Sequence, residues 1–307
     1  MPTVATNAAR PLVCTLFEGD YHLGAAALIN SLHATGFTGI IVCGHRGPPP
    51  PWAAAAFQLA PAIEVHCVPV TTTIHLTNHK PAFLRATWRA HPEAETLYYF
   101  DPDIVVKAPW TVLARWARDG IALVEDVNAN FPAGHPYRLA WLDFFRRSSF
   151  TPIRSLERYY NAGFIGLPRS QADLLNRWET LVAAGARETG SLGVLKHAGP
   201  HALFHSADQD ALNMALLLGP EPIHAAGPEG MDFLPGGHLL SHAAGGTKPW
   251  RGGFLRDALR GRPPGLAQKA FFAHLAGPLP VFPAAIRWRL ALSLRAAALM
   301  GRFYRRT

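Results

Sequence analysis

Short apolar runs alternate with segments of helical spacing between residues 12 and 100, and few folds accommodate such an alternation. The apolar runs predict buried strands, and the intervening segments have the helical period of about 3.6 residues. Strands are expected at 12–17, 40–43, 63–70 and 96–100, and helices at 23–34, from Pro51 onward and at 80–90. Strands that alternate with helices pair mostly in parallel and are covered on both faces. We therefore expect an α/β fold with one Rossmann-like, mostly parallel sheet, whose ligand lies beyond the carboxyl ends of its strands.

The positive charge of the chain gathers at its C-terminal end. The chain carries 29 Lys and Arg residues against 21 Asp and Glu residues, a net charge of +8. The first 257 residues hold 20 of the basic and all 21 acidic residues, and the last 50 hold nine basic residues. A nucleic-acid-binding domain spreads basic residues over a folded face, so this division argues against nucleic acid as a partner. We divide the chain into a body, residues 11–257, and a basic, Pro-containing tail, residues 258–307.

Within the tail, residues 284–306 have the pattern of an amphipathic helix. At about 100° per residue, five arginines fall within about 100° of arc, and apolar side chains fill most of the remainder. These arginines are Arg287, Arg295, Arg302, Arg305 and Arg306. The pattern is typical of a helix that lies on an anionic membrane surface. The alternative is a helix that docks on the body and turns its basic face to solvent.

The cysteine content and the hydropathy of the chain indicate its cellular compartment. Cys14, Cys43 and Cys67 are an odd number of cysteines without C-x-x-C spacing, which indicates reduced thiols. The chain has no run of roughly 18 apolar residues, and residues 1–10 lack the apolar segment of a signal peptide. We expect a cytoplasmic protein, at the inner face of the membrane if the tail binds lipid.

Two carboxylates, those of Asp101 and Asp103, follow the apolar run 96–100 with only Pro102 between them. Burying two carboxylates beside apolar flanks is costly unless a cation or hydrogen-bond donors offset the cost. Carboxylate oxygens are suitable ligands for Mg²⁺ and Mn²⁺, and this spacing lets both side chains reach one ion. The alternative is a solvated turn, the common setting of a lone Asp-x-Asp.

A second cluster of functional groups lies between residues 241 and 250. It combines the imidazole of His242, a glycine pair that begins at Gly245, and the ammonium group of Lys248. Imidazole binds metal ions, a glycine backbone can approach a phosphate closely, and lysine supplies a point positive charge. Together with the acidic pair, these groups could bind a diphosphate and its metal ion.

The order of these motifs along residues 11–257 resembles that of glycosyltransferase family 8 and its close relatives, a group that includes glycogenin and bacterial lipooligosaccharide galactosyltransferases. The matching segments are Leu16 to Tyr21, Lys80, Asp101-Pro102-Asp103, Asn161-Ala162-Gly163, Asp208-Gln209-Asp210 and His242-x-x-Gly245-x-x-Lys248-Pro249-Trp250. The chain departs from the family at Pro102, within the acidic pair, and at Ala162, where the family usually has serine.

The resemblance implies a GT-A fold and a metal-dependent transfer of a hexose from a nucleotide sugar, usually a UDP-sugar, to a glycan or lipid-linked acceptor. It implies that Asp101, Asp103 and His242 hold Mn²⁺ or Mg²⁺, and that Asp208 and Gln209 are catalytic. The implied donor-binding residues are Leu16, Tyr21, Lys80, Asp101, Asn161, Gly245 and Lys248. The residues alone also allow Tyr21 to be an ordinary packing residue, and Asp208, Gln209 and Asp210 to be acidic and capping residues at the beginning of a helix. The resemblance also implies retention of configuration at the anomeric carbon. We expect a front-face substitution because the amide of Gln209 is a poor nucleophile; double displacement through Asp208 is the rival mechanism.

Two other classes of protein share some of these features: sugar nucleotidyltransferases and catalytically silent nucleotide-sugar-binding proteins. A sugar nucleotidyltransferase would share the sheet and an acidic metal ligand, but it would carry a Gly-rich, basic phosphate loop after its first strand, which this chain lacks. A catalytically silent nucleotide-sugar-binding protein is disfavoured because all three candidate metal ligands are present. Asp126, after Leu123-Val124, could contact the acceptor or the donor sugar, but an ordinary carboxylate at a strand end is the preferred interpretation.

Overall fold

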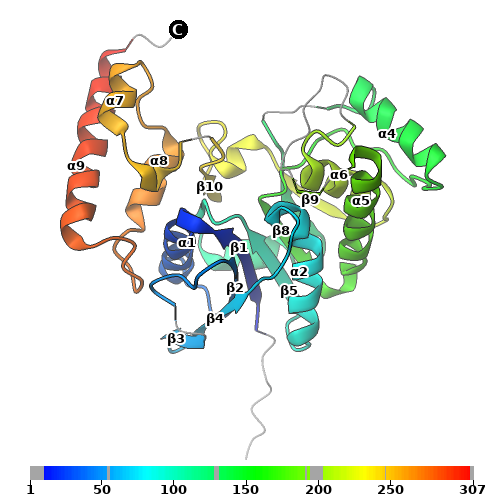
Figure 1. Ribbon diagram of the computed structural model, residues 1–307, viewed down its shortest axis with the longest axis horizontal. Helices are drawn as coiled ribbons and strands as arrows, with labels where there is room; N and C mark the ends of the chain where they lie inside the picture. Colours follow the sequence, from blue (N-terminus) through cyan, green and yellow to red (C-terminus); the bar gives the residue numbers. More distant parts are fainter. Residues whose placement is uncertain are drawn as a thin grey trace, which may run out of the picture.

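A computed structural model describes residues 10–53, 56–127, 131–190, 192–193, 203–245 and 247–304. An eight-stranded sheet lies at its centre, in the order β3-β4-β2-β1-β5-β8-β7-β9 (Figure 1). The strands are β1 (Leu12–Glu18), β2 (Gly39–Arg46), β3 (Ala56–Ala60), β4 (Ile63–Pro69), β5 (Thr96–Phe100), β7 (Ile121–Val124), β8 (Phe164–Pro168) and β9 (Ile223–Ala226). Strands β4, β2, β1 and β5 are parallel neighbours, whereas β8 is antiparallel to β5 and β7, and edge strand β3 is antiparallel to β4. This mixed, mostly parallel sheet confirms the predicted α/β class.

Helices cover both faces of the sheet, as the alternation of buried side chains in β1 requires. Leu12, Cys14 and Leu16 belong to a core cluster with the helices of one face, and Val13 and Phe17 belong to a second cluster on the opposite face. The first face carries α2 (Leu76–Ala90), α4 (Pro136–Arg147), α5 (Asp173–Thr189) and α6 (Ala207–Leu217). The second carries α1 (His22–Ala34) and α3 (Trp110–Trp116).

A small second sheet brings two distant segments together. Strand β6 (Ile104–Val106) directly follows the Asp101-Pro102-Asp103 segment and pairs antiparallel with β10 (Leu240–His242). His242 is opposite Ile104, and the N–H of Ala243 donates to the carbonyl oxygen of Asp103 at 3.0 Å. The pairing therefore places His242 beside the acidic pair.

The C-terminal segment contributes to the core before it reaches its last helix. It contains α7 (Phe254–Leu259), α8 (Leu266–Ala273) and α9 (Ala284–Met300), at the left of Figure 1. The side chains of Phe271, Leu275, Leu279 and Val281 are buried in the same cluster as α1. The amide of Asn30 in α1 also donates to the carbonyl oxygen of Leu279 at 2.8 Å. The hydrophobic core thus continues past residue 257 to residue 281.

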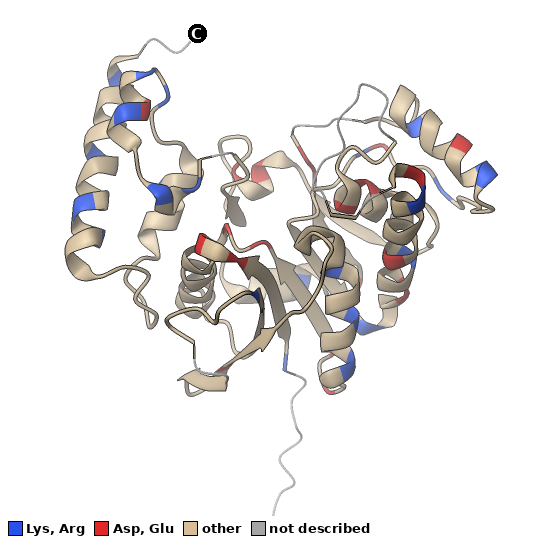
Figure 2. Cartoon of the chain, viewed as in Figure 1, with Lys and Arg blue, Asp and Glu red and all other residues tan. Residues whose placement is uncertain are grey.

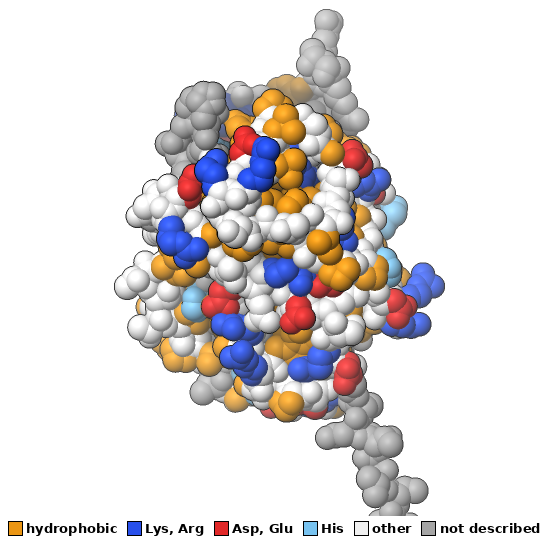
Figure 3. Space-filling view, turned by 90° about the vertical axis from the view of Figure 1, so that its right-hand side faces the viewer, with side chains coloured by type: hydrophobic (Ala, Val, Ile, Leu, Met, Phe, Trp, Pro, Cys, Tyr) orange, Lys and Arg blue, Asp and Glu red, His pale blue; other side chains and the backbone are white. Residues whose placement is uncertain are grey.

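Helix α9 packs on α7 and leaves much of its surface exposed. Leu294 and Ala297 are buried against Phe254 and Ala258. Basic residues recur along α7, α8 and α9 with few acidic residues between them (Figure 2). By contrast, basic and acidic side chains are interspersed on the face over α4 and α5 (Figure 3). No helix within the described ranges is long and apolar enough to span a membrane.

Three sequence-based element boundaries differ from the structure. The helix expected from Pro51 is wrong: a turn at residues 51–52 is followed by edge strand β3, whose hydrogen bonds to β4 override the local helical pattern. Helix α2 begins at Leu76 rather than at residue 80, because the ring nitrogen of His75 accepts the N–H of Thr77 and caps it. Helix α9 ends at Met300 and a short 3-10 turn follows; residues 305 and 306 lie outside the described residues.

Candidate active site

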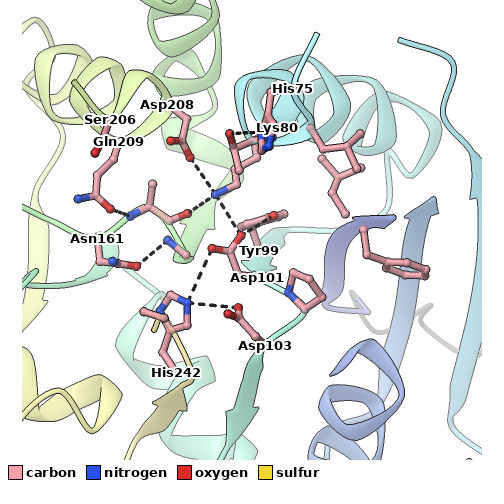
Figure 4. A pocket seen from close by; sticks show the side chains of 18 of the residues that line it. His75, Lys80, Tyr99, Asp101, Asp103, Asn161, Ser206, Asp208, Gln209 and His242 are labelled. Carbon is pink, nitrogen blue, oxygen red and sulfur yellow. Dashed lines mark hydrogen bonds and ion pairs between the residues drawn. The ribbon is translucent and has the colours of Figure 1, made fainter. Parts of the chain in front are cut away.

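A cavity of about 520 Å³ lies where β1, β5 and β7 end (Figure 4). Glu18 at the end of β1, Asp101 after β5 and Asp126 after β7 line it. Helices α2 and α6 begin beside it, so polar groups from several segments converge at this edge of the sheet. The sequence-predicted residues that line the cavity are Leu16, Tyr21, Lys80, Asp101, Asp103, Asn161, Asp208, Gln209, His242 and Lys248.

Asp101, Asp103 and His242 form a candidate metal centre in this cavity. Each residue offers one ligand atom, and the three atoms lie within 4.8 Å of one another. The Nε2 atom of His242 is 3.2 Å from a carboxylate oxygen of Asp103 and 3.9 Å from one of Asp101. Two carboxylate oxygens and an imidazole nitrogen are a donor set that Mg²⁺ and Mn²⁺ accept, so these residues fit a divalent cation.

Gly163 allows two of the candidate ligands, Asp101 and His242, to converge. A Cβ atom at this position would lie 2.7 Å from the His242 ring and 2.9 Å from a carboxylate oxygen of Asp101. The carbonyl oxygen of Gly163 also accepts the N–H of Asp101 at 2.7 Å. Any side chain at residue 163 would therefore push these two candidate ligands apart.

Lys248 contacts the candidate metal centre directly. Its Nζ atom donates to Asp103 at 2.6 Å and to the carbonyl oxygen of Ala243 at 2.7 Å. Burial alone would raise the pKa of Asp103, but His242 and Lys248 outweigh this effect and hold the pKa well below its ordinary value. Asp103 is therefore an anion across the physiological pH range, the state that a metal ligand requires.

Lys80 is a buried cation that joins two carboxylates. Its side chain is 2% exposed, and its Nζ atom is 3.0 Å from a carboxylate oxygen of Asp101 and 3.0 Å from one of Asp208. Burial alone would lower the pKa of Lys80, but these two carboxylates hold it above its ordinary value. The lysine thus links the candidate metal centre to the beginning of α6.

Three residues form a hydrogen-bonded group in another part of the cavity. The carboxylate of Asp126 accepts the side-chain amides of Asn161 and Gln209 at 2.6 and 3.2 Å. Asp126 lies just after β7, at the strand end predicted from the sequence, and its side chain lines the cavity, where the alternative interpretation of this residue would place it. Its position after a strand at the predicted ligand-binding edge is the sequence signal for this location.

Tyr21 is held by residues of the 248–251 segment. Its ring contacts Trp250 edge-on, with 5.1 Å between the centroids, and the Lys248 ammonium is 5.7 Å from its centroid. Arg251 forms two hydrogen bonds with the carboxylate of Asp20, at 2.8 and 3.0 Å. These contacts hold the turn after β1 against the segment that carries Lys248.

Two residues that line the cavity were not predicted from the sequence, and one predicted residue does not line it. His75 and Tyr99 line the cavity, and the Tyr99 hydroxyl donates to Asp101 at 2.8 Å. His75 lies before a helix and Tyr99 within an apolar strand, so neither showed a motif. Gly245 lies next to the lining residue Ala244 but is not itself among the lining residues.

Asp210 stabilises the beginning of α6 from outside the cavity. Its carboxylate accepts the Tyr159 hydroxyl at 2.6 Å and the N–H of Ser206 at 2.9 Å. Burial raises the pKa of Asp210 to about 7 in spite of these donors. The last carboxylate of the Asp208-Gln209-Asp210 segment is therefore a structural group.

Comparison with known proteins finds similarity in structure but not in sequence. No protein-family model matches the chain, and no curated protein matches its sequence. Among solved structures, the galactosyltransferase LgtC in complex with donor and acceptor sugar analogs matches with a TM-score of 0.54 and 16% identity, over 91% of this chain and 100% of LgtC. An active-site variant of LgtC in which glutamate replaces glutamine also matches, with a TM-score of 0.52 and 15% identity over 91% of this chain and 99% of the variant.

Two further solved structures have the same fold. The bifunctional glycosyltransferase WbbM matches with a TM-score of 0.51 and 15% identity, over 93% of this chain and 52% of WbbM. The glycosyltransferase GlyE of Streptococcus pneumoniae matches with a TM-score of 0.52 and 13% identity, over 95% of this chain and 64% of GlyE. The chain thus spans about half of WbbM and just under two thirds of GlyE. These similarities show that the chain has the GT-A fold predicted from its sequence.

Proposed function

We propose that this chain is a metal-dependent glycosyltransferase that moves a hexose from a nucleotide sugar, a UDP-sugar being the expected donor, to a glycan or lipid-linked acceptor. The observation that carries the proposal is the convergence of Asp101, Asp103 and His242 within 4.8 Å, beside Lys248, in a cavity at the strand ends. The solved LgtC complex holds donor and acceptor sugar analogs, which supports the same substrate class here.

The candidate ligands and Lys248 account for recognition of the diphosphate. A divalent cation held by Asp101, Asp103 and His242 would supply Lewis acidity to the leaving diphosphate. Lys248 lies beside Asp103, where its ammonium group can neutralise charge that remains on the phosphates. Tyr21, on the same side of the cavity, is proposed to stack on the base.

Asn161, Asp208 and Gln209 are proposed to face the hexose. The bond between the anomeric carbon and the diphosphate oxygen breaks, a bond to the acceptor oxygen forms on the same face, and the acceptor proton passes to the leaving diphosphate. This front-face route retains the configuration. It is favoured because Lys80 pairs with Asp208 at 3.0 Å, which reduces the nucleophilicity that a double displacement would need.

A donor panel tests the proposed function. The protein is incubated with Mn²⁺ and with UDP-, GDP-, CDP- and ADP-hexoses, and release of the nucleoside diphosphate and of the free hexose is measured. We expect slow hydrolysis of a UDP-hexose in the absence of acceptor. A parallel reaction with UTP and hexose 1-phosphate should release no pyrophosphate; pyrophosphate release without donor hydrolysis would instead identify a nucleotidyltransferase.

Replacing Lys248 by alanine should weaken UDP binding by about tenfold, the order expected for one charge-assisted contact. Lys248→Arg should recover the affinity only in part, because a guanidinium is larger and planar. Calorimetric titration with UDP and Mn²⁺ measures both variants. Lys107→Ala is the matched control, since Lys107 also pairs with an aspartate, Asp232, but does not line the cavity. Unchanged UDP affinity in Lys248→Ala would remove this lysine from the diphosphate site.

We propose further that α9 associates with anionic membranes. Trp288 is 70% exposed and Phe303 is 82% exposed, although both are large apolar side chains. Wild-type protein should sediment with anionic vesicles at low salt and much less at high salt, because ions screen charges beyond a Debye length of about 8 Å at physiological strength. Trp288→Ser/Phe303→Ser should reduce binding without unfolding the protein. Equal binding to neutral and anionic vesicles would contradict the proposal.

A further inference from the structure

Asp126 is a buried carboxylate that accepts hydrogen bonds from two side-chain amides. The residue is 4% exposed and lies just after β7, with its side chain at the cavity. One of its oxygens, Oδ2, accepts from Nδ2 of Asn161 at 2.6 Å and from Nε2 of Gln209 at 3.2 Å. Two side-chain amides from distant segments therefore meet at a single carboxylate oxygen.

The oxygen atoms of the same two amides accept consecutive backbone N–H groups. The N–H of Gly163 donates to Oδ1 of Asn161 at 2.8 Å, and the N–H of Ala162 donates to Oε1 of Gln209 at 3.1 Å (Figure 4). Rotating either amide by half a turn would place its NH₂ group against an N–H donor and its oxygen against the carboxylate. Each amide thus has one favourable orientation.

Asn161 and Gln209 both line the cavity, and the orientation matters most for Gln209 because its oxygen has capacity to accept a further contact from the cavity. The Ala162 N–H occupies one of the two lone pairs of its oxygen, so acceptor capacity remains. A neutral amide oxygen is a weak stabiliser of positive charge. The carboxylate 3.2 Å from Nε2 polarises the amide and increases the negative charge on Oε1.

The carboxylate of Asp208 differs from that of Asp126 because it forms an ion pair with the buried Lys80. Asp208, directly before Gln209, has its charge offset by the buried ammonium group at 3.0 Å. Gln209 and Asp126 together form a separate, polarised acceptor within the cavity. An amide held in this way can face a sugar that develops positive charge without forming a covalent bond to it.

We propose that Asp126 is a positioning residue that fixes the Gln209 amide and polarises its oxygen toward the hexose of the donor. The inference rests on the proposed function for the identity of the hexose, but the orientation of the amide does not. Two independent measurements therefore test it, one on the folded protein without substrate and one on turnover.

Nuclear magnetic resonance of the glutamine side chains tests the orientation directly. The chain has only four glutamines, so ¹⁵N-labelling of their side-chain amides gives four NH₂ pairs, and Gln209→Ala assigns the pair of Gln209. We expect Asp126→Ala to shift this pair and to speed its exchange with water at least about tenfold. Asp126→Asn keeps an oxygen acceptor and should shift the pair less. An unchanged Gln209 pair in Asp126→Ala would overturn the inference.

Turnover tests whether Asp126 acts through Gln209. Asp126→Ala should lower kcat about 10- to 100-fold and change the KM for the donor less than about threefold, with partial recovery in Asp126→Asn. In a Gln209→Ala background, Asp126→Ala should cost less than about a further twofold. Independent, multiplicative losses would show that Asp126 does not act through Gln209. If wild-type protein turns over no donor, the proposed function fails, and the resonance shifts still decide the orientation.

Discussion

Replacing Asp103 by asparagine should lower turnover at least about 100-fold, equivalent to about 3 kcal/mol of transition-state stabilisation. Asparagine keeps the size of the side chain but removes the negative charge of a carboxylate whose Oδ1 lies 3.2 Å from His242 and whose Oδ2 lies 2.6 Å from Lys248. The candidate metal centre would then lose one of its two carboxylates and the partner of its lysine. Mn²⁺ affinity should fall in parallel, and paramagnetic resonance of free Mn²⁺ measures it without substrate.

Asp232→Asn is the matched control for this variant. Asp232 also accepts hydrogen bonds from a lysine, Lys107, at 2.7 and 2.9 Å, but it lies outside the cavity. Its backbone has a φ of 58°, a conformation that asparagine tolerates. Asp232→Asn should keep full Mn²⁺ affinity and turnover. If Asp103→Asn also kept both, Asp103 would not be a metal ligand.

Replacing Lys80 by methionine should cost about 3–5 kcal/mol in the free energy of unfolding, as when one partner of a buried ion pair is removed. Methionine fills much of the same volume, but the carboxylates of Asp101 and Asp208 then lose the cation that lies 3.0 Å from each. Turnover of the fraction that remains folded should also fall, because Asp101 is no longer held beside His242. Urea unfolding and donor hydrolysis measure the two effects.

Lys107→Met separates the general cost of losing an ion pair from the effect on the site. Lys107 pairs with Asp232 and donates to the carbonyl oxygen of Gly237 at 2.8 Å, outside the cavity. Its own side chain is 28% exposed but that of Asp232 is only 2% exposed, so the loss of Lys107 should also cost stability, whereas turnover should be unchanged. A stable and fully active Lys80→Met variant would refute the role given to Lys80.

The fold was largely predictable because its main determinants are local. The apolar runs at 12–17 and 96–100 correspond to β1 and β5, and the acidic pair after residue 100 lies at the strand end where ligands bind in such sheets. Spacing within the sequence therefore indicated both the sheet and the place of two candidate metal ligands. The third, His242, was inferred from the family resemblance and reaches them through the pairing of β6 with β10.

The remaining features depend on contacts between distant segments. Lys80 and Asp208 are 128 residues apart, and no local pattern indicates that a lysine in a helix is fully buried between carboxylates. The distribution of charge led us to divide the chain at residue 257. Charge does not indicate that Phe271 and Leu275 are buried, because their burial depends on the surface that α1 presents to them. Likewise, the edge strand β3 exists because β4 supplies its hydrogen-bond partners.

Release of nucleoside diphosphate by metal-free and Mn²⁺-loaded protein tests the central claim most directly. The wild-type protein is treated with EDTA, its residual metal content is measured by atomic emission, and hydrolysis of the preferred donor is followed before and after addition of Mn²⁺. Because Asp101, Asp103 and His242 are proposed to act only through a bound cation, we expect release to stop in EDTA and to return with Mn²⁺. Undiminished release by protein shown to be free of metal would contradict the claim.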